Sequence, residues 1–319
     1  MLLFCLVCIM NGLISNEWFC FTILFRHFLL LSVLFVIMSV VTLDDFVTFD
    51  YSTLYPADAH PANAFFNLFA HPAVPFIVAF VYFFGSKIFC DILISIFKID
   101  PKSPNLKNFI TAHSALLAVY SGWTCVNVAQ LIYSHYQVSG NMYDTLTASK
   151  EEFWDGRWGM SFWITHFYIS KYYEFIDTWI VLLKGRTPIF LQTYHHAGIV
   201  LVMWALSVTH CTPVIVCVLL NSFIHTLMYT YYTFAAFGYS SPLKHYLTQM
   251  QIGQFLIGLS TTVPLHFMNG ADGKPRLTPA QDVALWAIEW YAVVLIALFA
   301  QFYASAYGKK PSKKDDKKE

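Results

Sequence analysis

The sequence predicts an all-α integral membrane protein with seven transmembrane helices. Hydrophobic residues make up 57% of the 319 residues and charged residues only 12%, whereas roughly one quarter of the residues in soluble domains are charged. Several windows without a stable charge have about the length needed to cross a hydrocarbon core of roughly 30 Å. Segments rich in Gly, Pro, Asn and Asp separate these windows and are typical of loops.

The expected spans form one membrane domain with no soluble module. Apolar runs bounded by Pro, Gly, Asn or charge define them. We place them near residues 74–95, 109–133, 160–183, 189–208, 212–235, 246–267 and 282–306. Before them, residues 1–45 form a hydrophobic extension without the basic flank and cleavage site of a clear signal peptide. An extra helix, an uncleaved signal and a mis-assigned start all stay open.

The distribution of cations predicts the orientation in the membrane, since positively charged loops tend to stay cytoplasmic. The loops after the first, third and fifth spans, together with the basic tail 309–319, hold twelve lysines and arginines, and the other three loops hold four. The C-terminus is therefore expected in the cytosol.

The net charge of zero gives no indication of a nucleic-acid partner. The seven cysteines are scattered, mostly in apolar runs, which favours buried thiols over a disulfide or zinc framework.

Ionisable residues are concentrated in the third span, where each costs a few kcal/mol on insertion scales. The segment ISKYYEFIDTWIVLL contains Lys171, Glu174, Asp177 and Thr178. Helical spacing places Lys171, Glu174 and Thr178 on one stripe, with Asp177 beside it. Lys171 and Glu174 alone fit a self-neutralising pair near a membrane surface equally well. Asp177 has no cation one turn after it, which favours a functional role.

The next three spans continue this polar pattern. In LQTYHHAG, Gln192 lies one turn before the adjacent histidines His195 and His196. These point about 100° apart on a helix and therefore need separate partners. The fifth span aligns Asn221, His225 and Tyr229, flanked by Tyr232, and the sixth span spaces Thr248, Gln251 and Gln254 at intervals of three. Any single stripe fits a polar seam between helices, but four consecutive spans predict a shared interior site.

The histidine spacing distinguishes between two kinds of enzyme. Membrane di-iron desaturases and hydroxylases use several clusters of closely spaced histidines, whereas here His195 and His196 are the only two of twelve histidines within four residues of each other. A single metal on His195, His196 and His225 would lack an obvious fourth ligand, unless Asp177 serves. Neutral imidazole, with a reference pKa of about 6.5, can instead attack an activated thioester. A seven-helix receptor or channel is the non-enzymatic alternative, although the polar spans face a cation-rich cytosolic mouth.

Four segments carry a family resemblance: KYYEFIDT, LQTYHH, NSFIHTLMYTYY and TQMQIGQ, in this order. Together they resemble the very-long-chain fatty acid elongases, the membrane 3-ketoacyl-CoA synthases, over roughly residues 65–308. The usual HxxHH box of the family has Gln192 in its first position here, a variant that resembles polyunsaturated-acyl elongases of algae and other microbial eukaryotes. Glutamine cannot take a proton, so no obligatory acid or base occupies that position.

The resemblance implies an endoplasmic reticulum protein in which helices two to seven form an inverted barrel around an acyl tunnel. Family members condense an acyl-CoA with malonyl-CoA, releasing CO₂ and CoA and leaving a 3-ketoacyl-CoA two carbons longer. No cofactor or metal is implied. The implied partners are membrane lipid and the ketoacyl reductase, dehydratase and enoyl reductase of the elongation cycle, and a homodimer stays open.

By matched position, the resemblance makes His195 the nucleophile that accepts the acyl group, with Asp177 and Gln192 orienting the imidazoles. His225 would assist decarboxylation of malonyl-CoA, supported by His196, Asn221 and Tyr229, although which of His195 and His225 is the nucleophile stays open. The candidates for contacts with substrate or CoA are Lys171, Glu174, Thr178, Lys184, Arg186, Tyr232, Lys244, Gln251 and Gln254. Trp204, Phe223 and Trp286 are candidates for the closed end of the tunnel, although core packing is the commoner role of such side chains.

Overall fold

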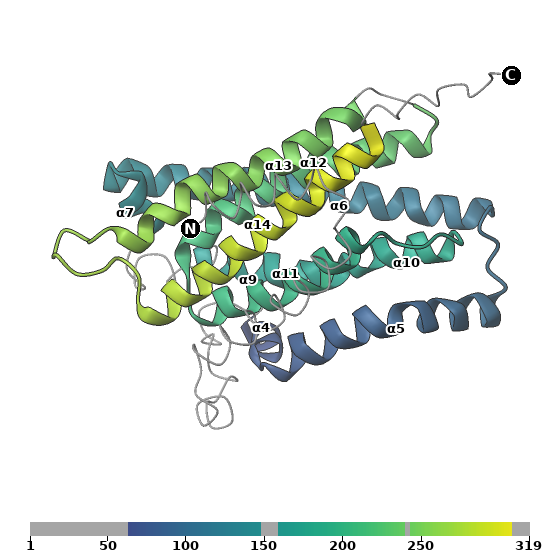
Figure 1. Ribbon diagram of the computed structural model, residues 1–319, viewed down its shortest axis with the longest axis horizontal. Coiled ribbons are helices and arrows are strands. Elements are labelled where there is room, and N and C mark those ends of the chain that lie inside the picture. The colour runs from purple at the N-terminus through teal and green to yellow at the C-terminus, as the bar shows by residue number, and fades with distance from the viewer. Residues whose placement is uncertain (1–62, 148–158, 240–242, 308–319) are drawn as a thin grey trace, which may run out of the picture.

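The described part of the chain is built from helices (Figure 1). In this computed structural model it comprises residues 63–147, 159–239 and 243–307, where an isolated bridge between Asn269 and Pro275 is the only β-type pairing. The predicted all-α class is therefore confirmed. The predicted extension 1–45 and the basic tail 309–319 lie outside the described residues.

Each predicted span coincides with a helix or with two adjacent helices. The helices are α4 (Asn63–Ala70), α5 (Ala73–Phe97), α6 (Pro104–Ser139), α7 (Met142–Leu146), α9 (Met160–Tyr173), α10 (Phe175–Leu183), α11 (Phe190–Val208), η2 (Thr212–Val214), α12 (Ile215–Ala236), α13 (Leu243–Thr262), η3 (Val263–Phe267) and α14 (Pro279–Tyr307). Within the described residues, four segments are long and apolar enough to cross a membrane: α5, α6, Thr212–Ala236 and α14. These four helices indicate a membrane protein.

Local sequence signals explain where α6 begins and ends. The Ser103 side chain accepts a hydrogen bond from the Leu106 backbone N–H at 3.2 Å, and Pro104 occupies the first turn, where its missing N–H costs nothing. At the other end, Gly140 adopts a left-handed conformation with φ of 66° and donates its N–H to the Tyr136 carbonyl. A residue without Cβ suits this position, so the helix stops there.

The long helices pack in a closed order. Contacts run from α6 to α12, then to α13, α14, α11 and α9, and α9 in turn touches α6. Helix α5 lies outside this cycle against α11 and α10, and Figure 1 shows it along one edge of the bundle. This order brings residues from the second to the seventh predicted spans to one interior.

A buried apolar cluster joins α9, α11 and α14 and anchors the short helix α4. The Trp204 indole N–H donates to the Ala70 carbonyl at 2.7 Å, and the Tyr168 hydroxyl donates to the Phe69 carbonyl at 3.1 Å. Both carbonyls belong to the last turn of α4, whose carbonyls have no partner within the helix. Trp204 is therefore a core residue that secures α4.

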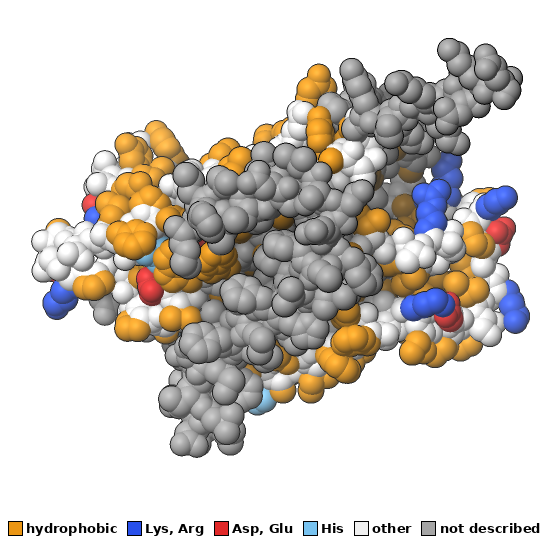
Figure 2. All heavy atoms as spheres, viewed as in Figure 1, with side chains coloured by type: hydrophobic (Ala, Val, Ile, Leu, Met, Phe, Trp, Pro, Cys, Tyr) orange, Lys and Arg blue, Asp and Glu red, His pale blue; other side chains and the backbone are white. Residues whose placement is uncertain are grey.

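Positive charge gathers at one end of the molecule. Figure 2 shows lysine and arginine side chains at the end where α5 meets α6 and where α10 finishes. The described loops at this end carry Lys98, Lys102, Lys184 and Arg186, and the first turn of α6 carries Lys107. The opposite end carries Lys274 and Arg276 between η3 and α14, where Arg276 pairs with Asp144 at 2.5 Å. The described ends therefore keep the charge asymmetry seen in the sequence.

Trp204→Phe tests the anchoring of α4. The substitution removes the indole N–H and leaves the Ala70 carbonyl unpaired in a buried place, so we expect the free energy of unfolding to fall by about 1 to 3 kcal/mol. Thermal unfolding of the detergent-solubilised protein measures it. Trp123→Phe is the control, because Trp123 is 42% exposed. Equal losses in the two variants would contradict the assigned role of the Trp204 hydrogen bond.

Candidate active site

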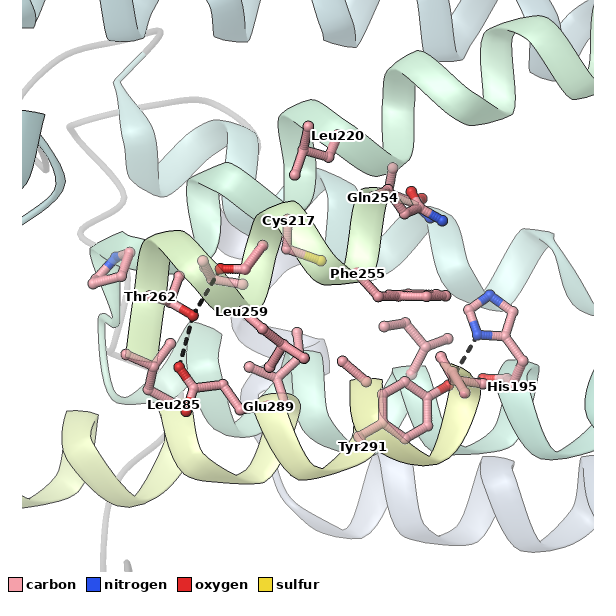
Figure 3. A pocket seen from close by; sticks show the side chains of 18 residues that line it. His195, Cys217, Leu220, Gln254, Phe255, Leu259, Thr262, Leu285, Glu289 and Tyr291 are labelled. Carbon is pink, nitrogen blue, oxygen red and sulfur yellow. Dashed lines mark hydrogen bonds between the residues drawn. The ribbon is translucent and has the colours of Figure 1, made fainter. Parts of the chain in front are cut away.

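An apolar pocket lies between α11, α12, α13 and α14 (Figure 3). His195 lies at one end of the pocket, and Thr262 and Glu289, joined by a hydrogen bond, lie at the other. Between them the wall is mostly aliphatic and aromatic. The pocket therefore offers a long apolar ligand one imidazole at one end.

Tyr291 of α14 holds the His195 ring. Its hydroxyl donates to the His195 backbone carbonyl at 2.7 Å and lies 3.0 Å from His195 Nδ1. The two rings are nearly parallel, with an angle of 17° between their planes. Figure 3 shows the phenol and the imidazole at the same end of the pocket. Sequence analysis missed Tyr291, because it lies in an apolar run without a polar stripe.

The orienting role of Gln192 stays a prediction. In the part of the chain that the structure describes, no hydrogen bond joins its side chain to a histidine, and Nδ1 of His196 is buried without a hydrogen-bond partner. The orienting partner of His195 is Tyr291 instead, which approaches from a different helix. An amide one turn away on the same helix shares its face without reaching the ring nitrogen, so sequence spacing alone could not distinguish the two arrangements.

A buried ion pair lies beside this site. Lys171 Nζ is 2.6 Å from Glu174 Oε1 and 3.1 Å from Asn221 Oδ1, and both charged side chains are 2% exposed. The ammonium also lies 3.9 Å from the centre of the Phe167 ring. His225 Nδ1 is 3.6 Å from the same Glu174 oxygen. Lys171, a predicted candidate for CoA phosphates, thus lies in an interior network, and its contact with CoA stays a prediction.

Asp177 and Thr178 bind other residues than the predicted ones. The Asp177 carboxylate lies 2.9 Å from His113 Nε2 on α6 and accepts a hydrogen bond from the Tyr229 hydroxyl at 2.5 Å. Asp177 thus orients His113 and Tyr229, and the expected bonds to the other histidines are absent from the described hydrogen bonds. Thr178 is buried and shares a hydrogen bond of 2.7 Å with Tyr82 of α5. Sequence analysis missed His113, although the segment NLKNFITAHS loosely resembled a family stretch.

A second polar cluster that the sequence analysis missed closes the far end of the pocket. His266 of η3 lies between two carboxylates, 2.6 Å from Asp282 and 2.9 Å from Glu289, and its ring stacks on Trp286 with centroids 4.0 Å apart. Trp286 therefore supports this cluster from outside the pocket. Neither Trp204 nor Phe223, which is 47% exposed, lines the pocket either.

The remaining predicted contacts are distributed between the mouth and the wall. Lys184 and Arg186 are exposed in the loop between α10 and α11. Tyr232 is 46% exposed, and Gln254 lines the pocket. Gln251 lies on the turn before Gln254 and donates to Met228 Sδ. The side chain of Lys244 lies outside the described residues.

The described residues contain no group of three or more histidine, cysteine, aspartate or glutamate side chains that could hold a metal ion. His195 and His196 have ring centroids 5.4 Å apart, and His195 faces Tyr291. The arrangement suits nucleophilic and acid–base chemistry by imidazole, next to an apolar pocket. Fold and site together define a membrane enzyme that acts on a long apolar substrate.

Comparison with known proteins gives the family. The model of the family described as ELO, the GNS1/SUR4 family, matches residues 67–315. The chain belongs to this family. It is 33% identical to "Fatty acid elongase sre1" of Dictyostelium discoideum over 219 residues, which is 68% of this chain and 79% of that protein. It is 31% identical to "Very long chain fatty acid elongase 2" of Mus musculus over 66% of this chain and 70% of that protein. These findings support fatty acid elongation as its function.

Glu174→Gln tests the buried ion pair. It leaves the Lys171 ammonium without a carboxylate in a buried place, so we expect the free energy of unfolding to fall by about 3 to 5 kcal/mol. The double variant Lys171→Met with Glu174→Gln removes the charge as well and should regain most of that loss. Thermal unfolding in detergent measures both variants. A single variant as stable as the native protein, or a double variant no more stable than the single, would contradict the assignment.

Proposed function

We propose that the protein is a very-long-chain 3-oxoacyl-CoA synthase, which condenses a long-chain acyl-CoA with malonyl-CoA. The observation that carries this proposal is the position of His195 at one end of an apolar pocket between four helices. An acyl chain fits the apolar wall, which places its thioester carbon at the imidazole. The second substrate, malonyl-CoA, supplies the carbon nucleophile after it loses CO₂.

His195 is the nucleophile in this proposal, and His225 assists decarboxylation. The surroundings of the two imidazole rings, those of His195 and His225, differ. His195 lines the pocket, whereas His225 Nδ1 lies 3.6 Å from Glu174 in the network with Lys171 and Asn221. A ring near a carboxylate and a cation suits the transfer or stabilisation of charge on the enolate. No cofactor or metal enters the reaction.

The membrane arrangement belongs to the same proposal. Seven spans cross the endoplasmic reticulum membrane, and the second to the seventh form a barrel around the acyl tunnel. The closed order of contacts from α6 to α14 supports the barrel, and the concentration of cations at one end supports a cytosolic mouth and C-terminus. At this mouth, Lys184, Arg186 and Lys244 are candidates for binding the phosphates of CoA.

The substrate class and partners follow from the family. We propose unsaturated acyl chains of the polyunsaturated series as substrates, on the basis of Gln192 in place of the usual first histidine of the box. The 3-ketoacyl-CoA product needs reduction, dehydration and a second reduction to become a saturated thioester. The ketoacyl reductase, the dehydratase and the enoyl reductase of the cycle are therefore proposed partners, and membrane lipid surrounds the helices. A homodimer is a further proposed assembly, and the molecular mass of the protein in detergent tests it.

An elongation assay tests this function. Membranes from cells that express the protein receive labelled malonyl-CoA and a panel of acyl-CoAs of differing length and unsaturation. We expect 3-ketoacyl products two carbons longer than the acyl donor. His195→Ala and His225→Ala should each lose at least about 100-fold in rate, because each removes an imidazole that takes part in the chemistry. Binding of acyl-CoA without turnover by the native protein would contradict the proposal.

The same preparations separate this mechanism from the metal-dependent alternative. Metal analysis of the purified protein should find no stoichiometric iron, and chelators should leave elongation unchanged. Stoichiometric iron together with loss of activity on chelation would contradict the imidazole mechanism and favour a desaturase-like or hydroxylase-like enzyme.

A further inference from the structure

We propose that Tyr291 is a positioning residue that fixes the tautomer of His195 and leaves Nε2 free to attack, and that Gly198 provides the space for its ring. This inference rests on the proposed function, in which His195 is the nucleophile. It assigns a role to a residue of the last helix that lies outside every polar motif of the sequence.

The hydrogen bonds of one hydroxyl determine the tautomer. The Tyr291 hydroxyl has a single proton and donates it to the His195 carbonyl at 2.7 Å, the usual length of an O–H···O bond. The contact between Tyr291 and His195 Nδ1 is 3.0 Å, the usual length of an N–H···O bond. With the phenol proton already donated, Nδ1 must carry the hydrogen of this second bond. The lone pair of the neutral ring is then on Nε2.

This tautomer is the one that acyl transfer needs. Nε2 attacks the thioester carbon, so a C–N bond forms, the C–S bond breaks and CoA leaves as a thiolate. The proton stays on Nδ1, in its bond to Tyr291, and the product is an acyl-imidazolium with one positive charge.

In the second half-reaction, malonyl-CoA loses CO₂ and leaves an enolate, whose carbon attacks the acyl carbon. The new C–C bond forms, the C–N bond breaks, and His195 returns neutral with Nδ1–H in place. The charges balance without any proton transfer at His195.

Gly198 leaves the space that lets the Tyr291 ring approach α11 and His195 closely. It lies three residues after His195, on the next turn of α11. A Cβ at position 198 would lie 2.6 Å from Tyr291 Cε2 and 3.3 Å from Cζ. Such a distance is too short for two carbon atoms, so any larger residue would move the phenol away from His195. The hydrogen bonds of the Tyr291 hydroxyl to His195 therefore depend on the absence of a side chain at Gly198.

The chain offers a matched control for the test. Tyr194 precedes His195, and its ring centroid lies 5.6 Å from that of Tyr291. Its hydroxyl is buried and has no hydrogen-bond partner among the residues that the structure describes. Tyr291→Phe and Tyr194→Phe therefore each remove one buried hydroxyl from neighbouring rings, but only Tyr291→Phe removes the acceptor of the Nδ1 hydrogen. A difference between the two variants reports on the tautomer rather than on packing.

The experiment measures the first half-reaction in the purified full-length protein. Stearoyl-CoA and a polyunsaturated C18 acyl-CoA are each added without malonyl-CoA, and release of CoA is followed over a single turnover. We expect Tyr291→Phe to slow this release by about 10- to 100-fold, as the loss of an orienting partner does at other imidazole sites. The concentration of acyl-CoA giving half the maximal rate should change less than about threefold. Tyr194→Phe should release CoA at the native rate.

Gly198→Ala provides a second, independent measurement. It should slow CoA release at least as much as Tyr291→Phe does, while Gly253→Ala, where an added Cβ meets nothing within 4 Å, should keep the native rate. If Gly198→Ala fails to fold, the pair of tyrosine variants still decides the matter. Normal CoA release by Tyr291→Phe, or equal losses in Tyr291→Phe and Tyr194→Phe, would overturn the proposal.

The failure of this inference is distinguishable from the failure of the proposed function. If His195→Ala still releases CoA and elongates acyl-CoA, His195 is not the nucleophile and the proposed mechanism itself is wrong. If His195→Ala is inactive but Tyr291→Phe releases CoA at the native rate, the mechanism stands and only the role of Tyr291 is lost.

Discussion

A polar side chain inside a membrane domain has no water to bind, and the protein must therefore supply a partner for it. The structure of this elongase depends on that constraint. Lys171 of α9 is paired with Glu174 and bonded to Asn221 of α12. Asp177 of α10 joins His113 of α6 to Tyr229 of α12. Each network connects helices that are distant in sequence, so the polar residues fix how the helices are placed around the interior.

The same constraint shapes the pocket. Most of its wall is apolar, and the polar groups at its ends are held by other protein groups: His195 by Tyr291, and Glu289 by Thr262 and His266. In the proposed mechanism, an apolar wall that limits the access of water would protect an acylated imidazole from hydrolysis. In the same proposal, the bond to Tyr291 of a neighbouring helix keeps the hydrogen of the His195 ring on Nδ1 and leaves Nε2 free.

The sequence predicted most of the fold and part of the site. Hydropathy and loop composition located the helices, because both depend on neighbouring residues along the chain. Helical spacing also identified the stripe of Lys171 and Glu174 and the line of Asn221, His225 and Tyr229. It could not predict their partners across helices, which depend on how the helices pack. Hence the bonds of Asp177 to His113 and Tyr229, and the burial of Lys171 in an interior network, could not be predicted. Tyr291, within an apolar run, gave no signal at all.

In the proposed mechanism His195 carries the acyl group between the two half-reactions, and mass spectrometry can detect that group on the protein. The purified protein is incubated with a C18 acyl-CoA in the absence of malonyl-CoA, then quenched and digested. We expect the added mass of one acyl group on the peptide that contains His195, and its disappearance when malonyl-CoA is added before quenching. An acyl group on the peptide that contains His225, or elongation with no acylated peptide at any time, would contradict it.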